Sequence, residues 1–382
     1  MSSRHLVMVI SSLRSGGAER VASTVANAFA QKMRVTIVCL SNKEDAFYSL
    51  SGDVSVMYLD LLSPQSSVMG AVKANVYRIR TMRKTIKDLE PDLIVSFMLE
   101  TNVLMFLSQL AVKTPLVVCE HTDPELVQHK LPWRVLRNLT YRLCDRVVVL
   151  NEYMKSWFEK SGSRRVCVIP NPIQVGVNDN VDLQTPKPYI LGMGRLIASK
   201  SFDRLIEAYA MTRQTFPDWH LVIAGDGGLK EVLQQQIVAR DLEGYVHLIG
   251  NTSQPQRWMK QAEIFASTSK IEAFPMAICE AMMSGLPVVA VAYNPGVETL
   301  IPATAGFVVP QDEKPNLGCE QLFVTALEEL MGDVEKRKRM GKQAAQSVEK
   351  YAVANVIKQW EVLFDELETN TSLLHSTSSR KS

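Results

Sequence analysis

The sequence predicts two doubly wound α/β domains in one chain, each built on a parallel β-sheet with helices on both faces. One observation is the length of 382 residues, which is too long for one compact core and suits two domains. Another is the recurrence of short, apolar, β-branched runs, which are typical of parallel strands buried on both faces. A third is that helix-length segments separate these runs throughout both halves of the chain.

Thirteen apolar runs predict the strands, seven in the first half and six in the second. The first set comprises 6–12, 35–41, 54–60, 93–97, 116–121, 146–151 and 166–170. The second set comprises 189–194, 220–225, 246–250, 264–268, 287–292 and 306–310. Charged, amphipathic helices are expected after Glu320.

The domain boundary is expected at Pro170-Asn171-Pro172, because a polar, proline-bearing stretch follows it. The first domain would span 1–172 and the second 173–350, and the polar residues 371–382 predict a disordered tail. Residues 1–175 carry 22 Lys and Arg against 15 Asp and Glu, whereas the remainder is net acidic. A basic half joined to an acidic half suggests that the two domains meet different partners.

Composition also narrows the class of protein. No stretch approaches the roughly 18 apolar residues that span a bilayer, and the N-terminal run reads as a core strand and not as a secretion signal. Six scattered cysteines without a C-x-x-C pair are typical of packing thiols in a reducing cytoplasm. Without metal-ligand spacing or interleaved aromatic and basic residues, we expect neither a metal site nor nucleic-acid binding.

The strongest motif is the segment 269–280, which follows a predicted strand and enters a helix over 276–284. Open parallel sheets bind ligands where their strands end, and the start of this helix offers backbone amides to a diphosphate. Glu280 is then placed for ribose hydroxyls and Glu272 for those of a transferred sugar, with an ordinary solvated helix face as the alternative. The helix start comprises Phe274, Pro275, Met276 and Ala277.

A second motif, Gly-Met-Gly-Arg-Leu-Ile-Ala-Ser-Lys over 192–200, closes the first strand of the second half. Its glycines allow a tight turn and close approach to a ligand. Arg195 presents a planar fork of donors to phosphate oxygens, and Lys200 adds a point charge. Two cations in one such loop favour a diphosphate site over ordinary surface charges, and they would stabilise a departing diphosphate.

Other strand ends carry weaker candidates for donor contact. Gly225 opens a glycine-rich loop, for which a plain turn is an equal alternative, and Asn251 directly follows the strand 246–250. Gly16 and Gly17 permit close backbone approach to a ligand, with a plain loop as the alternative, but do not complete a dinucleotide fingerprint. His121 ends the strand 116–121 between two acids, which favours hydrogen bonding to the donor sugar over a structural role or general-base work.

The segment 73–87 is basic and has helical periodicity. It carries six cations and no acid, with apolar residues spaced as a stripe. One interpretation is a surface helix with its stripe in the core; the other is docking on an anionic membrane or on a lipid-diphosphate acceptor. The cations are Lys73, Arg78, Arg80, Arg83, Lys84 and Lys87.

Taken together, the motifs resemble the retaining GT-B glycosyltransferases of glycosyltransferase family 4 over essentially the whole chain. The matching segments are GGAER (16–20), EHTDP (120–124), PNPI (170–173), GMGRLIASKSFDRLIEAYA (192–210), AGDG (224–227) and EAFPMAICEAMMSGLPVVA (272–290). The Glu-x7-Glu block with its Gly-Leu-Pro-Val-Val is specific. Ala273 departs from the pattern, because the family usually has glycine there.

The resemblance implies two Rossmann-like domains facing each other across a cleft, with a final helix near 351–368 packed back on the first domain. It implies that Arg195 and Lys200 hold the donor diphosphate. Glu280 would bind the ribose, Glu272 and the amides after it the donor sugar, and His121 would line the sugar pocket. Domain closure and front-face attack would follow from that arrangement.

The GGAER and Glu-His-Thr segments are most similar to bacterial enzymes that extend undecaprenyl-diphosphate-linked glycans such as O-antigen. We therefore expect a cytoplasmic enzyme, peripheral on the plasma membrane, that needs no cofactor or metal. It would transfer a hexose or N-acetylhexosamine from a nucleotide sugar, a UDP-sugar by preference, to a lipid-linked glycan. The alternatives are a glycan phosphorylase or nucleotide-sugar epimerase, or an inactive binding subunit of a glycan assembly complex.

Overall fold

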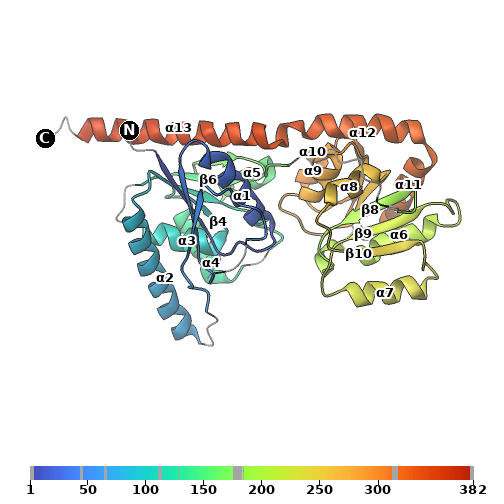
Figure 1. The fold of residues 1–382 in the computed structure, drawn as a ribbon, viewed down its shortest axis with the longest axis horizontal. Helices are drawn as coiled ribbons and strands as arrows, with labels where there is room; N and C mark the ends of the chain where they lie inside the picture. The colour runs from blue at the N-terminus through green and yellow to red at the C-terminus, as the bar shows by residue number, and fades with distance from the viewer. Residues whose placement is uncertain are drawn as a thin grey trace. The chain divides into compact units, whose positions relative to one another are not determined.

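A computed structural model describes residues 4–43, 46–63, 67–110, 114–127, 129–174, 183, 185–311 and 317–378. The chain divides into two compact units (Figure 1). Unit 1 comprises Met1–Pro172 and Val353–Ser382, and unit 2 comprises Ile173–Ala352. The expected boundary falls between the same two residues, 172 and 173.

Unit 1 is built on a parallel sheet of seven strands in the order β3-β2-β1-β4-β5-β6-β7. The order reverses at β1, where Val7 pairs with Thr36 on one side and Ile94 on the other. Every strand begins within one residue of a predicted apolar run. The strands are β1 (His5–Ile10), β2 (Arg34–Cys39), β3 (Val54–Tyr58), β4 (Leu93–Phe97), β5 (Leu116–Cys119), β6 (Arg146–Val149) and β7 (Val166–Val168).

Unit 2 is built on a parallel sheet of six strands in the order β10-β9-β8-β11-β12-β13. Here the order reverses at β8, which pairs with β9 on one side and β11 on the other. The two sheets confirm the predicted doubly wound architecture. The strands are β8 (Tyr189–Met193), β9 (His220–Ala224), β10 (Val246–Gly250), β11 (Ile264–Ser267), β12 (Val288–Ala292) and β13 (Gly306–Pro310).

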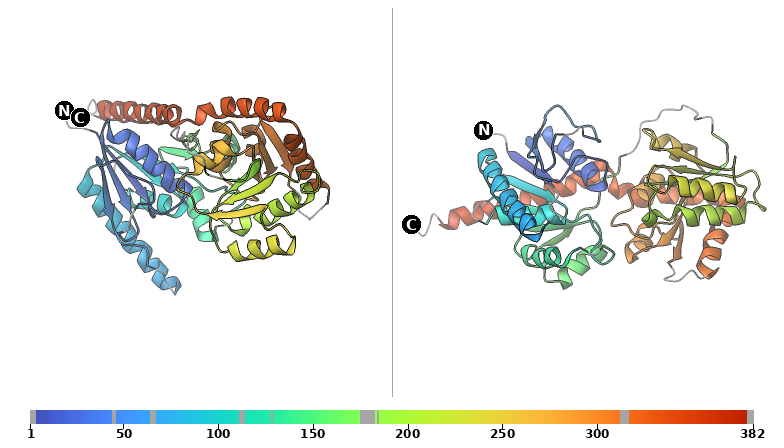
Figure 2. Two further views of the ribbon diagram at one scale, coloured as in Figure 1. Left: turned by 45° about the vertical axis from the view of Figure 1, so that its right-hand side comes forward. Right: turned by 90° about the horizontal axis from the view of Figure 1, so that it is seen from below.

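Helices of unit 1 connect most of its strands, although β2 and β3 follow one another without a helix between them (Figures 1 and 2). Right-handed crossovers that turn back at β1 place α1 on one face of the sheet and the helices between β3 and β7 on the other. Side chains cap two of them: Ser67 accepts from the amide of Gly70, and Asn151 from that of Met154. The helices are α1 (Gly17–Ala30), α2 (Val68–Leu89), α3 (Leu99–Ser108), α4 (Leu131–Thr140), α5 (Glu152–Lys160) and α13 (Val353–Ser378).

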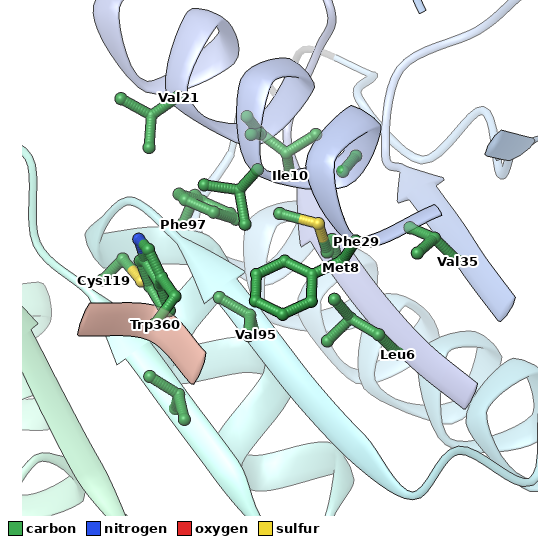
Figure 3. Close-up of a cluster of buried hydrophobic side chains, with 14 of the residues drawn as sticks. Leu6, Met8, Ile10, Val21, Phe29, Val35, Val95, Phe97, Cys119 and Trp360 are labelled. Atoms are coloured by element: carbon green, nitrogen blue, oxygen red, sulfur yellow. The ribbon is translucent and has the colours of Figure 1, made fainter. Parts of the chain in front are cut away.

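The main core of unit 1 joins both ends of the chain. Figure 3 shows Met8 of β1, Phe29 of α1 and Trp360 of α13 in one apolar cluster. The ring of Phe29 lies 4.9 Å from that of Phe364, between ring centroids. The final helix therefore completes this core, and the segment 351–368 that the family resemblance assigned to the first domain lies largely within it.

Helix α13 also shows where the predicted tail was wrong. The helix continues to Ser378, whereas disorder was expected from residue 371 onward. The stretch from Val353 to Ser378 contains neither proline nor glycine, so no residue in it interrupts the helical backbone hydrogen bonds. Residues 379–382 lie outside the described part of the chain.

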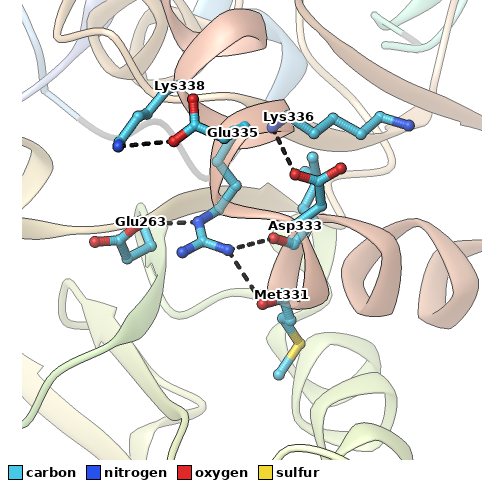
Figure 4. A network of polar contacts seen from close by, with 8 residues as sticks. Glu263, Met331, Asp333, Glu335, Lys336 and Lys338 are labelled. Carbon is cyan, nitrogen blue, oxygen red and sulfur yellow. Dashed lines mark hydrogen bonds and ion pairs between the residues drawn. The ribbon is translucent and has the colours of Figure 1, made fainter.

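In unit 2 the last helices are fastened to the sheet by a buried arginine. Arg337 is 7% exposed and donates from Nε to Glu263 and from its NH1 group to the carbonyls of Leu330 and Met331, at 2.7–3.1 Å. Figure 4 labels two of these partners, Glu263 and Met331. These bonds hold α12 against the strand β11 that follows Glu263. The helices are α6 (Phe202–Thr212), α7 (Lys230–Ala239), α8 (Pro255–Gln261), α9 (Met276–Met283), α10 (Pro295–Leu300), α11 (Leu317–Gly332) and α12 (Val334–Val348).

Candidate functional site

The reversal of strand order at β8 brings three loops of unit 2 together. Because β8 lies between β9 and β11, the loops that leave these three strands meet at the carboxyl edge of the sheet. The amide of Gly194 donates to the carbonyl of Ala224 at 3.0 Å, and the amide of Lys270 donates to that of Ser199 at 2.8 Å. The two strongest sequence motifs therefore share one edge, which we call the β8 edge.

Glycine is required where the loops after β8 and β9 touch. Gly225 has a φ of +146°, and a Cβ atom there would lie 1.9 Å from the carbonyl oxygen of Gly194. No side chain fits that space, so the two backbones approach as closely as peptide groups can. This contact fixes the course of the loop that carries Arg195 and Lys200.

The charged centre of the β8 edge is an ion pair between Lys200 and Glu272. Both side chains are 19% exposed, so the pair is largely shielded from water but open on one side. The same carboxylate oxygen, Oε1, also accepts from the Ser269 hydroxyl at 3.1 Å. Because both contacts use Oε1, the Oε2 atom of Glu272 has no hydrogen-bond partner among the described residues.

The remaining residues of the two motifs surround this pair. The Arg195 side chain is exposed and has no hydrogen-bond or ion-pair partner among the residues that the structure describes. Helix α9 begins at Met276, and the amides of its first turn have no acceptor within the helix. Phe274 is buried with its ring against Tyr351, at 5.4 Å between centroids, and Glu280 is 6% exposed on α9.

Other donor-binding candidates belong to other loops than the ion pair. Asn251 is exposed at the end of β10, an edge strand two positions from β8, or on the order of 10 Å at ordinary strand spacing. Gly16 and Gly17 belong to unit 1, at the start of α1. A Cβ at Gly17 would meet no atom within 4 Å, so folding alone does not demand glycine there.

His121 lies in unit 1 just after β5, with its ring 5.6 Å from that of Phe97 between centroids. Burial lowers the pKa of this imidazole to about 4. The ring is therefore neutral at physiological pH, where it can donate or accept a hydrogen bond but is a weak base. This favours the predicted hydrogen-bonding role over general-base catalysis.

The two acids that flank His121 have structural tasks. Glu120 is buried, and its carboxylate accepts from the hydroxyl of Tyr141 and the amide of Thr122, both at 3.1 Å. Asp123 accepts from the amides of Glu125 and Leu126 at 3.0 and 3.1 Å, which closes a turn. Both positions therefore shape the loop that carries the histidine.

Helix α2 contains the basic segment and divides into two parts. Met82 and Ile86 are buried, as the surface-helix interpretation predicts. Arg78 donates to the carbonyl of Leu61 at 2.9 Å, and Arg83 donates to those of Leu107 and Ser108 at 3.1 and 2.9 Å. Those two guanidinium groups brace the unit, while Lys73, Arg80, Lys84 and Lys87 are exposed.

The first part of α2 departs from the surface-helix interpretation, because its apolar side chains face solvent. They are Val68, Met69, Val72, Val76 and Tyr77, between 43% and 84% exposed. Positions 69, 72, 76, 80, 84 and 87 share one helical face at three- and four-residue spacing. That face is apolar for its first two turns and basic thereafter.

Sequence reasoning missed two contributors to the β8 edge. Ser269 positions Glu272 from within the same loop, and its place three residues earlier is compatible with that contact. Asn294 donates to the carbonyl of Glu272 at 3.2 Å from the start of α10. Because 22 positions of sequence separate these two residues, no short motif could have predicted the contact.

Within the described ranges, no three His, Cys, Asp or Glu side chains lie close enough to hold a metal ion. None of the helices described there is long and apolar enough to cross a membrane. Metal independence therefore stays a prediction that a chelator can test.

Two family models together match nearly the whole chain. The model described as Glycosyltransferase Family 4 matches residues 15–176, and the model described as Glycosyl transferases group 1 matches residues 178–347. The border between the two matches lies close to the division between units 1 and 2.

Relatives and solved structures agree with these models. A Campylobacter jejuni enzyme named GalNAc-alpha-(1->4)-GalNAc-alpha-(1->3)-diNAcBac-PP-undecaprenol alpha-1,4-N-acetyl-D-galactosaminyltransferase is 26% identical over 94% of this chain and 98% of its own. The amylovoran biosynthesis glycosyltransferase AmsD of Erwinia amylovora is 27% identical over 93% and 97%.

Two solved structures show the same fold. Sucrose-phosphate synthase from Thermosynechococcus elongatus superposes with a TM-score of 0.80 at 16% identity, over 96% of this chain and 100% of that one. Anabaena Alr3699/HepE in complex with UDP superposes with a TM-score of 0.73 at 20% identity, over 95% and 100%. With both halves matched and the two parallel sheets in place, the chain belongs to the GT-B glycosyltransferases of glycosyltransferase family 4.

Proposed function

We propose that this glycosyltransferase takes a hexose or N-acetylhexosamine from a UDP-sugar and adds it, with retention, to an undecaprenyl-diphosphate-linked glycan. The observation that carries the proposal is the Lys200–Glu272 ion pair at the β8 edge, in the loop that leads into α9. A cation, a carboxylate and a helix start in one place suit a diphosphate joined to a hydroxyl-bearing sugar.

In this proposal unit 2 holds the donor. Arg195, Lys200 and the first-turn amides of α9 bind the diphosphate, and these donors gain most when negative charge develops on it. Glu272 accepts from sugar hydroxyls through Oε2, while its Oε1 stays with Lys200 and Ser269. Glu280 accepts from the ribose hydroxyls.

Retention follows from attack on the donor's departing face. The acceptor hydroxyl oxygen bonds to the anomeric carbon as the bond from that carbon to the diphosphate oxygen breaks. The departing phosphate oxygen takes the acceptor proton, which leaves UDP and a glycoside of unchanged configuration. The neutral ring of His121 contributes a hydrogen bond to the sugar and takes no proton in this step.

The choice of substrates is supported by relatives. The Campylobacter jejuni relative is named for an undecaprenol-diphosphate-linked acceptor, and HepE was solved with UDP. Both chains match this one over nearly its whole length. We therefore place the enzyme at the cytoplasmic face of the plasma membrane, where such acceptors are extended.

The test is a transfer assay on the purified chain. UDP-GalNAc, UDP-galactose, UDP-GlcNAc and UDP-glucose are each incubated with undecaprenyl-diphosphate-linked oligosaccharides, with and without a chelator. We expect one UDP per sugar added, an α-linked product in the anomeric proton spectrum, and no loss of rate with chelator. Sugar 1-phosphates or epimerised donor would indicate another enzyme class, a β-linked product would exclude retention, and absence of UDP binding would favour an inactive subunit.

We also propose that α2 docks unit 1 on an anionic membrane surface. Its exposed face presents Val72 and Val76 to the acyl boundary and Arg80 and Lys84 to lipid headgroups. Each cation near such a surface contributes about 1 kcal/mol, and each buried valine about 1.5 kcal/mol or more. The expected preference is for membranes that contain anionic lipid.

Vesicle flotation measures this docking. We expect the chain to float with vesicles that contain phosphatidylglycerol and to stay behind with phosphatidylcholine alone. The double variant Val72→Glu/Val76→Glu should bind about tenfold or more weakly, because two apolar contacts become like-charged ones. The matched control, Val232→Glu/Val238→Glu on exposed positions of α7, should float like the unaltered chain. Equal loss in both double variants would contradict a specific role for α2.

A further inference from the structure

Unit 1 contains a cavity with charged lining, between the loop after β5 and the helices α4 and α5. Its volume is about 290 Å³, and we call it the Arg137 pocket. Neither the donor proposal nor the membrane proposal uses it. Its lining residues are Pro124, Glu125, Val127, Arg134, Arg137 and Trp157.

Arg137 is the unusual member of this lining. The residue is 3% exposed, and its Nε atom is buried and has no hydrogen-bond partner within the described ranges. A buried guanidinium group normally has its donors satisfied, because an unmet charged donor costs more free energy than a neutral one. Arg137 is therefore a buried cation with an Nε donor that the described residues do not use.

Two aromatic rings contact the guanidinium group. The Arg137 Cζ atom lies 4.7 Å from the ring centroid of Trp157 and 5.4 Å from that of Phe158. These cation–π contacts favour the charged group at this place but provide no oxygen acceptor for its five N–H donors.

The carboxylate of Glu120 is committed to other partners. Burial lowers the pKa of Arg137, and the charge of Glu120 acts against that shift. The Glu120 carboxylate nevertheless bonds to Tyr141 and Thr122 and forms no ion pair with the guanidinium group. Tyr141 in turn accepts from Asn102 at 2.8 Å. This buried chain commits the Glu120 carboxylate to Tyr141 and Thr122 and leaves Nε of Arg137 without a partner in the described ranges.

Other groups around the pocket fit a charged saccharide. Arg134 lies one turn before Arg137 on α4 and is exposed, so a second guanidinium group lines the same cavity. The Glu125 carboxylate is held by the Tyr153 hydroxyl at 2.6 Å and is an acceptor for sugar hydroxyls. The partly exposed indole of Trp157 adds an apolar wall of the kind on which sugar rings stack.

We propose that the Arg137 pocket binds an oxyanion, a phosphate or a carboxylate, carried by the acceptor glycan. Arg137 and Arg134 grip the oxyanion, and Trp157 and Glu125 contact the adjoining sugar. The acceptor part of this statement rests on the proposed transfer function, whereas anion binding by the pocket does not. The two sources of the oxyanion, a phosphate group and an acidic sugar, share this chemistry.

Fluorine NMR of the full chain labelled with 5-fluorotryptophan tests anion binding directly. Trp157→Phe assigns the reporter among the five tryptophans. Inorganic phosphate, inorganic pyrophosphate and glucuronate are the probes. We expect a saturable shift of the Trp157 signal, while UDP leaves this signal unmoved. Tighter binding of phosphate or pyrophosphate would identify a phosphate group as the source of the oxyanion, and tighter binding of glucuronate would identify an acidic sugar.

Two variants decide whether the arginines are responsible. Arg137→Gln should weaken binding about tenfold or more, and Arg134→Gln, at an exposed position, by a smaller factor without loss of fold. The four other tryptophan signals report whether each variant is folded. Two outcomes would show an adventitious ion only and overturn the proposal. One is a Trp157 shift in the unaltered chain that does not saturate, and the other is a shift in folded Arg134→Gln and Arg137→Gln that equals the shift in the unaltered chain.

Acceptor kinetics separate this proposal from the transfer function. Arg134→Gln should raise the KM for the acceptor several-fold and leave the KM for the donor unchanged. If no acceptor is glycosylated but the anion titration succeeds, the transfer function fails and the pocket stands. If transfer proceeds and anions do not shift Trp157, the pocket fails and the transfer function stands.

Discussion

Replacing Lys200 with alanine should lower kcat by about 10² to 10³, because the departing diphosphate loses a charged donor at the β8 edge. Glu272 would keep its contact with Ser269 but would lose its counter-charge in a largely shielded place, so the fold should lose about 1–3 kcal/mol. Arg195→Ala should lower turnover similarly, because it removes the other proposed diphosphate cation. Its stability should change little, because the exposed Arg195 side chain makes no hydrogen bond or ion pair in the described structure. UDP release with saturating donor and acceptor measures kcat, and urea denaturation measures the free energy of unfolding.

Lys270→Ala is the matched control for this experiment. Lys270 belongs to the same pair of loops and is exposed, and it contacts the neighbouring loop through its backbone amide and not through its ammonium group. The variant should keep near-normal turnover and stability. Near-normal activity in both Lys200→Ala and Arg195→Ala would remove these residues from the proposed mechanism.

Replacing Gly225 with alanine should destabilise unit 2 by about 2–4 kcal/mol. The new methyl group would overlap the carbonyl oxygen of Gly194, which is backbone and cannot rotate away, and φ would remain at +146°. Any relief requires the loops after β8 and β9 to separate, which moves Arg195 and Lys200. We therefore expect a lower urea midpoint together with weaker UDP binding by calorimetry.

Gly228→Ala in the same loop provides the comparison. A Cβ at Gly228 would meet no atom within 4 Å, so this variant should stay within about 0.5 kcal/mol of the unaltered chain. If the two alanine variants unfold at the same urea concentration, the close approach between Gly225 and Gly194 does not limit stability.

The strands were predictable because parallel sheets bury both faces of every strand. Runs such as 35–41 and 288–292 are apolar without alternation, which few other structures require. The strand-end rule then placed the motifs of 192–200 and 269–280 at one edge before any contact was known. Strand ends were less exact, since a run such as 146–151 continues into the loop beyond Val149.

Tertiary contacts set the limit of prediction. In α4, Arg134 and Arg137 are equivalent by spacing, and only the rings of Trp157 and Phe158 decide which one is buried. In α2, the sequence could not show that Arg78 and Arg83 bond to carbonyls of other segments. The exposure of the α2 valines could not be predicted either, because an apolar stripe on a helix normally indicates burial and the sequence does not show how far the packing neighbours of α2 extend.

The placement of α13 has a consequence for the order in which the protein is made. Residues 1–172 leave the ribosome with the site for Trp360 unfilled, and unit 2 is synthesised in full before that side chain exists. Unit 2 can therefore fold while its predecessor still exposes apolar surface. Of the two units, the one whose synthesis starts earlier is therefore the one completed later.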